Sequence, residues 1–142
     1  MTHTHSHLQH KLSVDNAASF LYSGNALFSI KSKASGKHMT FKVQRTKDAR
    51  MYFVSVLNGE GFTYVGYVHA DLPMKLRKGK KGVGENTPSF KTADWLFRHL
   101  GGLEKNLKGA EFWHHGICGR CGRPLTDPTS IERGIGPVCH RY

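Results

Sequence analysis

Residues 39–43 read Met-Thr-Phe-Lys-Val, so large apolar side chains alternate with polar ones. This period of two residues is typical of a strand with one buried and one exposed face. Similar strands are expected at 28–31, 51–57 and 62–69, separated by short polar turns. The third turn contains Asn58-Gly59, which favours a tight hairpin because both residues tolerate a positive φ. These segments predict a four-stranded antiparallel meander.

Two helices are expected to pack on this sheet. Residues 14–22 follow Ser13, whose hydroxyl can cap a helix, and Gly24 offers a stop. A second helix is expected to end near residue 100 and to begin at a cap formed by Ser89 or Thr92. The predicted fold class is therefore α+β, a four-stranded antiparallel meander packed with one or two helices.

The α+β domain is expected to span residues 13–110. Two segments differ from the rest of it in composition, one before the domain and one within it. Residues 1–12 hold four histidines among Thr, Ser and Gln, and predict a disordered tail whose ability to bind metal stays open. Residues 74–88 combine Lys and Arg with Gly, Asn and Pro, which disfavour both helix and sheet. The second segment predicts an exposed basic loop.

The overall charge points to an anionic partner. The 142 residues include 21 Lys and Arg but 10 Asp and Glu, which gives a formal net charge of +11. Nucleic acid is the first candidate for such a basic chain. A mean hydropathy of -0.47, with neither a long apolar run nor a secretory signal, argues against a membrane protein and predicts a cytoplasmic location.

All three cysteines lie in the C-terminal segment 111–142, at Cys118, Cys121 and Cys139. The C-x2-C step lets two thiolates turn toward one ion, as in structural zinc sites. An odd number of cysteines suits a metal site better than a set of disulfides. We therefore expect zinc as the cofactor and a zinc-ribbon or knuckle-like subdomain.

A closed tetrahedral zinc site needs a fourth protein ligand. The candidates are His114, His115 and His140; spacing hardly separates the first two, and His140 is less favoured because residues adjacent in sequence, here Cys139 and His140, converge on one ion less easily. A site closed by four protein ligands has no open position for water or substrate, so its expected role is structural. We therefore expect no enzymatic activity.

The stretch from Cys118 to Cys139, CGRCGRPLTDPTSIERGIGPVC, resembles the C-terminal signature of a family of small, largely uncharacterised proteins from tailed bacteriophages and prophages. Members carry a Trp-His-x-Gly step before the first cysteine, which Trp113-His114-His115-Gly116 matches, and the resemblance thereby implies His114 as the fourth ligand. Weaker similarity continues upstream through the strands to the helix around Trp95. The resemblance implies a phage origin, expression in the host bacterial cytoplasm and a zinc-bound C-terminus, but no activity.

The first functional hypothesis is a phage-encoded, non-enzymatic zinc protein that binds DNA or RNA through a basic surface, with no membrane or small-molecule partner. Phosphate contacts are expected from Lys75, Arg77, Lys78, Lys80, Lys81, Arg120, Arg123, Arg133 and Arg141. The second is a small effector that binds a host protein, such as a defence nuclease, a polymerase or a repair complex, and inhibits or redirects it. A nuclease is a minor alternative, for which the sequence offers no matching acid and base groups.

Overall fold

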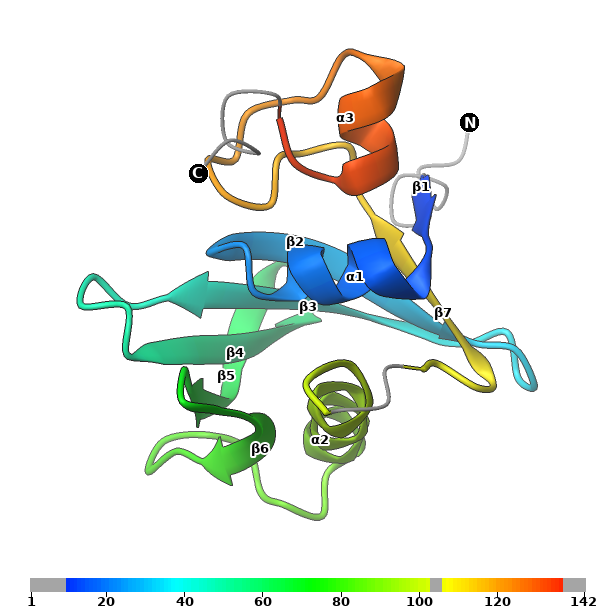
Figure 1. Cartoon of the computed structure of the whole chain (residues 1–142). Coiled ribbons are helices and arrows are strands. Elements are labelled where there is room, and N and C mark those ends of the chain that lie inside the picture. The colour runs from blue at the N-terminus through cyan, green and yellow to red at the C-terminus, as the bar shows by residue number, and fades with distance from the viewer. Residues whose placement is uncertain (1–9, 103–105, 137–142) are drawn as a thin grey trace.

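A computed structural model describes residues 10–102 and 106–136. In this part of the chain seven strands form one antiparallel sheet in the order β1-β7-β2-β3-β4-β5-β6. The strands are β1 (His10–Leu12), β2 (Asn25–Ser32), β3 (His38–Arg45), β4 (Met51–Asn58), β5 (Gly61–His69), β6 (Leu72–Lys78) and β7 (Ala110–His114). The helices are α1 (Val14–Leu21), α2 (Pro88–Leu100) and α3 (Pro128–Arg133). Helices α1 and α2 cover one face of the sheet, and α3 lies beyond its β1 edge (Figure 1).

The alternation in the sequence places the apolar side chains of the strands on the face that the helices cover. Phe28 of β2 lies opposite Phe41 of β3, and its ring stacks on Phe112 of β7 with 4.5 Å between centroids. Phe20 of α1 and Phe97 of α2 complete a group of fully buried phenylalanines. Burial of side chains of this size supplies the main apolar stabilisation of the domain.

Both predicted helices are present. The Ser13 hydroxyl accepts a hydrogen bond from the Asn16 N–H and caps α1 as expected. Helix α2 is capped by Thr87 rather than by Ser89 or Thr92. Pro88 then occupies the first turn, where its missing N–H costs nothing.

The sheet has seven strands rather than the four expected, and the predicted basic loop 74–88 is in part a strand. Residues 72–78 pair with β5 as β6, and Leu76 is buried on the helix side. Lys75 and Lys78, which hide this strand in the sequence, are exposed, whereas Arg77 is half-buried and its Nε is a buried nitrogen without a hydrogen-bond partner among the described residues.

The two other unexpected strands lie near the chain ends. Residues 10–12 belong to the predicted tail but form β1, and residues 110–114 overlap the predicted C-terminal subdomain but form β7. Strand β7 inserts between β1 and β2. The C-terminal segment therefore enters the sheet before it reaches the first cysteine. Within the described residues, no helix combines the length and the apolar character that a membrane span requires.

Candidate functional site

The C-x2-C step forms a tight turn stabilised by its own backbone. The Cys118 N–H donates to the Arg123 carbonyl at 2.8 Å, and the Gly122 N–H donates back to the Cys118 carbonyl at 3.0 Å. Gly122 has a φ of +79°, a conformation that side chains other than glycine rarely adopt. We call residues 116–136, which contain this turn and α3, the knuckle.

The Cys118 sulfur is the electrostatic centre of the knuckle. It is 1% exposed and accepts backbone N–H groups from Arg120 at 3.4 Å and from Gly136 at 3.3 Å. Burial acts to raise the pKa of the Cys118 thiol, but the N–H groups of Gly136, Cys121 and Arg120 and the Cys121 thiol together lower it to about 7. The turn therefore favours the thiolate, which is the form that binds zinc.

The contact from Gly136 shows that the end of the described chain reaches the first part of the predicted site. Gly136 precedes Cys139 by three residues and lies against the Cys118 sulfur. Cys139, His140 and Arg141 themselves lie outside the described residues. Within residues 10–102 and 106–136, which hold two of the three cysteines, no group of three His, Cys, Asp or Glu side chains could hold a metal ion.

The implied fourth ligand, His114, uses both of its ring nitrogens elsewhere. Its Nδ1 accepts the Gly116 N–H at 3.0 Å, and its Nε2 is 2.5 Å from the Ile131 carbonyl, to which it donates. The side chain is fully buried beside Phe20 and stacks on His10. Burial lowers the pKa of His114, consistent with a neutral ring that joins β7 to α3. Coordination of a metal would cost one of these two buried hydrogen bonds.

His115 lies on the other side of the sheet. Its Nε2 is 3.1 Å from the Ser29 hydroxyl, which in turn lies 2.7 Å from the Thr40 hydroxyl. Ser29 and Thr40 are paired residues of β2 and β3 on the face away from the helices. The structure therefore places His115 away from the knuckle, whose contacts are with the helix side.

The knuckle is anchored to the sheet domain through glycines. The Gly119 carbonyl accepts the Asn25 N–H at 2.6 Å and the Ser23 hydroxyl at 2.7 Å. A Cβ at Gly119 would lie 2.6 Å from the Phe20 ring, and a Cβ at Gly134 would lie 2.5 Å from it. Only glycine lets the knuckle backbone approach Phe20 this closely.

Eight of the nine predicted phosphate-binding residues lie in the described part of the chain, and the structure does not bring these eight onto one surface. Five of them occupy the β6 edge of the sheet and the turn that follows, namely Lys75, Arg77, Lys78, Lys80 and Lys81. Three belong to the knuckle, which adjoins α1 and the β1 edge, namely Arg120, Arg123 and Arg133. Because β1 and β6 are the two opposite edges of the sheet, these are separate basic regions.

The sheet face opposite the helices carries aromatic side chains that the sequence-based predictions did not include. Phe53 and Phe62 are 42% and 40% exposed. Phe53 meets Tyr64 edge to face at 5.9 Å, and the Lys42 ammonium lies 4.4 Å from the centre of the Phe62 ring. The sequence carries a signal for them, because in the alternating pattern of β4 and β5 these aromatic residues occupy positions of the exposed face. We call the sheet face opposite the helices the open face.

The turn after β6 brings two of the predicted cations to the open face. Lys80 and Lys81 line a shallow cavity of about 450 Å³ together with Phe53 and Tyr64. The Val83 N–H donates to the Tyr64 carbonyl at 3.1 Å and fastens the turn to β5. The basic cluster and the exposed aromatic rings therefore meet at one place.

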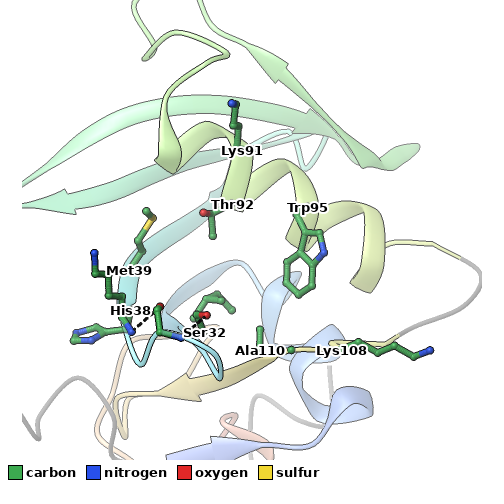
Figure 2. A pocket seen from close by; sticks show the side chains of 12 residues that line it. Ser32, His38, Met39, Lys91, Thr92, Trp95, Lys108 and Ala110 are labelled. Atoms are coloured by element: carbon green, nitrogen blue, oxygen red, sulfur yellow. Dashed lines mark hydrogen bonds between the residues drawn. The ribbon is translucent and has the colours of Figure 1, made fainter.

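A second cavity of about 580 Å³ lies on the helix side, between α2, the β2–β3 hairpin and the start of β7. Its apolar lining comes from Ile30, Met39, Trp95 and Ala110. Figure 2 shows the Trp95 ring directed toward the cavity, whereas the Lys91 and Lys108 side chains point away from it. The interior is therefore mainly apolar and suits a hydrophobic group better than a phosphate.

Comparison with known proteins supports a relationship for the C-terminal part only. Residues 109–142 match the model of a family described as a family of unknown function (DUF6011). The matched stretch begins just before β7 and contains the whole knuckle. No curated protein and no solved structure matches the chain. The match agrees with the expected resemblance to an uncharacterised family, over a shorter stretch than expected, and it assigns no activity.

Proposed function

We propose that the chain is a non-enzymatic, zinc-stabilised phage protein that binds nucleic acid in the cytoplasm of its host bacterium. The observation that supports nucleic-acid binding is the β6 edge, where Lys75, Arg77, Lys78, Lys80 and Lys81 fall within seven positions. No acidic residue interrupts residues 72–84. Such a cluster displaces condensed counterions when it meets a phosphate backbone, and this release favours binding.

The proposed zinc ligands are Cys118, Cys121, Cys139 and one histidine. The resemblance implies His114, but its coordination would replace a buried hydrogen bond and His115 is bonded to Ser29, so we favour His140 for the fourth ligand. The lowered pKa of the Cys118 thiol and the backbone N–H groups around its sulfur support Cys118 as one of the ligands. With four protein ligands the ion would order the knuckle and leave no position for a substrate.

The test of nucleic-acid binding is an anisotropy titration of labelled oligonucleotides over a range of salt concentrations. The logarithm of the affinity should fall linearly with the logarithm of salt concentration. Charge reversal by Lys78→Glu, Lys80→Glu and Lys81→Glu should weaken binding strongly and lower the slope by about 0.7–0.9 for each phosphate that the chain no longer neutralises. A control triple of equal charge change is Lys33→Glu, Lys37→Glu and Lys108→Glu. Lys33 and Lys37 lie in the β2–β3 turn and Lys108 in the adjoining turn before β7, so this triple should have a smaller effect.

The competing hypothesis, an effector that binds a host protein, makes a different prediction. A host protein would be retained in stoichiometric amount from a nuclease-treated host lysate, while the purified chain would bind no oligonucleotide. That pair of results would overturn nucleic-acid binding and favour the effector. Loss of all partners after nuclease treatment, with oligonucleotide binding in solution, supports the proposal.

A further inference from the structure

Four aromatic residues of two neighbouring strands lie on the open face; Phe53, Phe62 and Tyr64 adjoin lysine side chains, whereas Tyr67 pairs with Phe53 and contacts His69. Phe53 lies on β4, and Tyr64 and Phe62 lie on β5, in register with Ser55 and Leu57 of β4. Two of these rings are at least 40% exposed, although large apolar side chains are ordinarily buried. Neighbouring rings on a flat sheet offer consecutive stacking surfaces for planar groups.

Cations accompany Phe53, Phe62 and Tyr64. Lys42 lies over the Phe62 ring, and Lys80 and Lys81 border the cavity formed by Phe53 and Tyr64. The five central and edge strands β2–β6 contain no Asp or Glu. The open face over these strands therefore combines planar apolar surfaces with positive charge, and the nearest acidic residues are in the turns, at Asp48, Glu60 and Asp71. A ligand complementary to it carries flat rings and regularly spaced anions.

The Tyr64 ring is also held in a fixed place. Gly79 lies so close beneath the ring that a Cβ there would collide with it. The Val83 N–H bonds the Tyr64 carbonyl, and Phe53 supports the ring edge. A ring that is already positioned loses little conformational entropy when a partner stacks on it.

From this arrangement we infer that the ligand is single-stranded nucleic acid, whose bases stack on Phe53, Tyr64 and Phe62 while Lys42, Lys80 and Lys81 contact its phosphates. This inference rests on the proposed nucleic-acid function and adds the strand type and the binding path. In a duplex each base is stacked between its neighbours, so its faces are not available to stack on the exposed rings. A single strand offers free base faces, and stacking on them tolerates any sequence.

The test compares a labelled 15-nucleotide single strand with the duplex of the same sequence at one salt concentration, for both DNA and RNA. The wild-type chain should bind the single strand at least about tenfold more tightly. The double variant Phe53→Ala, Phe62→Ala should lose about fivefold to a hundredfold for each stacked base, and its duplex affinity should stay unchanged. Phe53→Tyr with Phe62→Tyr, which keeps both rings, should retain the affinity.

Photocrosslinking of a 5-bromouracil strand adds a readout of position. Cross-links should map to Phe53, Phe62 or Tyr64 in the wild-type chain. Leu72→Ala is the matched control, since Leu72 is an exposed apolar residue of β6 outside the aromatic group, and it should not change binding. Circular dichroism of each variant checks that the sheet is folded.

The outcomes separate this inference from the function on which it rests. Equal binding of single strand and duplex, with no effect of the alanine variants but a clear effect of the lysine reversals, would overturn stacking and leave nucleic-acid binding in place. Absence of binding to either form at low salt would overturn both. Preference for single strands that depends on the rings supports both.

Discussion

The sheet domain and the knuckle are stabilised in different ways. The sheet buries Phe20, Phe28, Phe41, Phe97 and Phe112 completely. In the knuckle, α3 buries one side chain, Ser130, and the backbone N–H groups of Arg120 and Gly136 point to the Cys118 sulfur. The first region can fold on apolar burial, whereas the second has too little of it and needs another source of free energy. A metal ion is the source that its cysteines suggest.

We expect the dependence between the two regions to run in one direction. Phe20 belongs to the core of the sheet domain, and Gly119 and Gly134 of the knuckle pack onto its ring. The knuckle backbone therefore packs on a side chain of the sheet domain. We expect the sheet to survive disorder of the knuckle, but the knuckle to be lost with the sheet.

The largest effect should follow from loss of a proposed zinc ligand. Cys121→Ser removes an exposed thiol, so it costs no packing, but it should abolish stoichiometric zinc and the binding free energy of about 10–16 kcal/mol seen for structural zinc in finger peptides. Trypsin should then cleave after Arg120 and Arg133, while the far-UV circular dichroism of the sheet persists. Zinc analysis and mass spectrometry of the digest measure both.

Histidine variants serve as controls for that experiment and identify the fourth ligand. His115→Gln should retain zinc, because the ring is hydrogen bonded to Ser29 on the open face. His140→Gln should lose it. Retention of zinc by Cys121→Ser, or unfolding of the whole chain, would contradict the division into two differently stabilised regions.

The fold also shows which helices and strands could be predicted from the sequence. Ser13 with α1 and the alternating segments of β2–β5 are local patterns, and the structure confirms them. Strand β6 was missed because Lys and Arg at its exposed positions obscure the single buried Leu76, and the three residues of β1 are too few to show a period.

For the candidate site, spacing predicted the C-x2-C turn but not what surrounds it. The hydrogen bond from His114 to Ile131 joins residues 17 positions apart, and no local pattern indicates it. Likewise, the approach of Lys80 and Lys81 to Phe53 depends on a turn that crosses from β6 to the open face. Interactions of this kind follow from the assembled sheet, and a single sequence does not contain them as a pattern.

The next largest effect should come from the apolar core of the sheet. Phe28→Ala leaves a cavity between Phe41 and Phe112 and should lower the free energy of unfolding by about 3–5 kcal/mol. Urea unfolding followed by circular dichroism measures the loss. Phe53→Ala removes a ring of the same size from the open face and should change stability by about 0.5 kcal/mol or less. Equal losses for the two variants would show that the open face is packed in solution.

A smaller effect is expected at the boundary between the two regions. Gly134 ends α3 with a φ of +78° and lies against Phe20, so Gly134→Ala combines backbone strain with a steric clash. We expect a loss of about 2 kcal/mol, confined to the knuckle. Gly136→Ala is the control, because its Cβ would have ordinary contacts at 3.9 Å and its N–H would still reach Cys118. Hydrogen exchange of knuckle amides in the two variants should differ, and equal protection would argue against close packing on Phe20.

The smallest effect should arise at the start of α1, on the sheet side of the boundary. Ser13→Ala removes the side chain that accepts the Asn16 N–H, and loss of such a cap costs about 1 kcal/mol. Ser13→Asn keeps an acceptor in the same place and should restore most of the stability. Because α1 belongs to the metal-independent part, the loss measured by urea unfolding should be the same with and without a zinc chelator. A cap effect that appears only with zinc bound would mean that the ion also stabilises α1, and that the two regions fold as one.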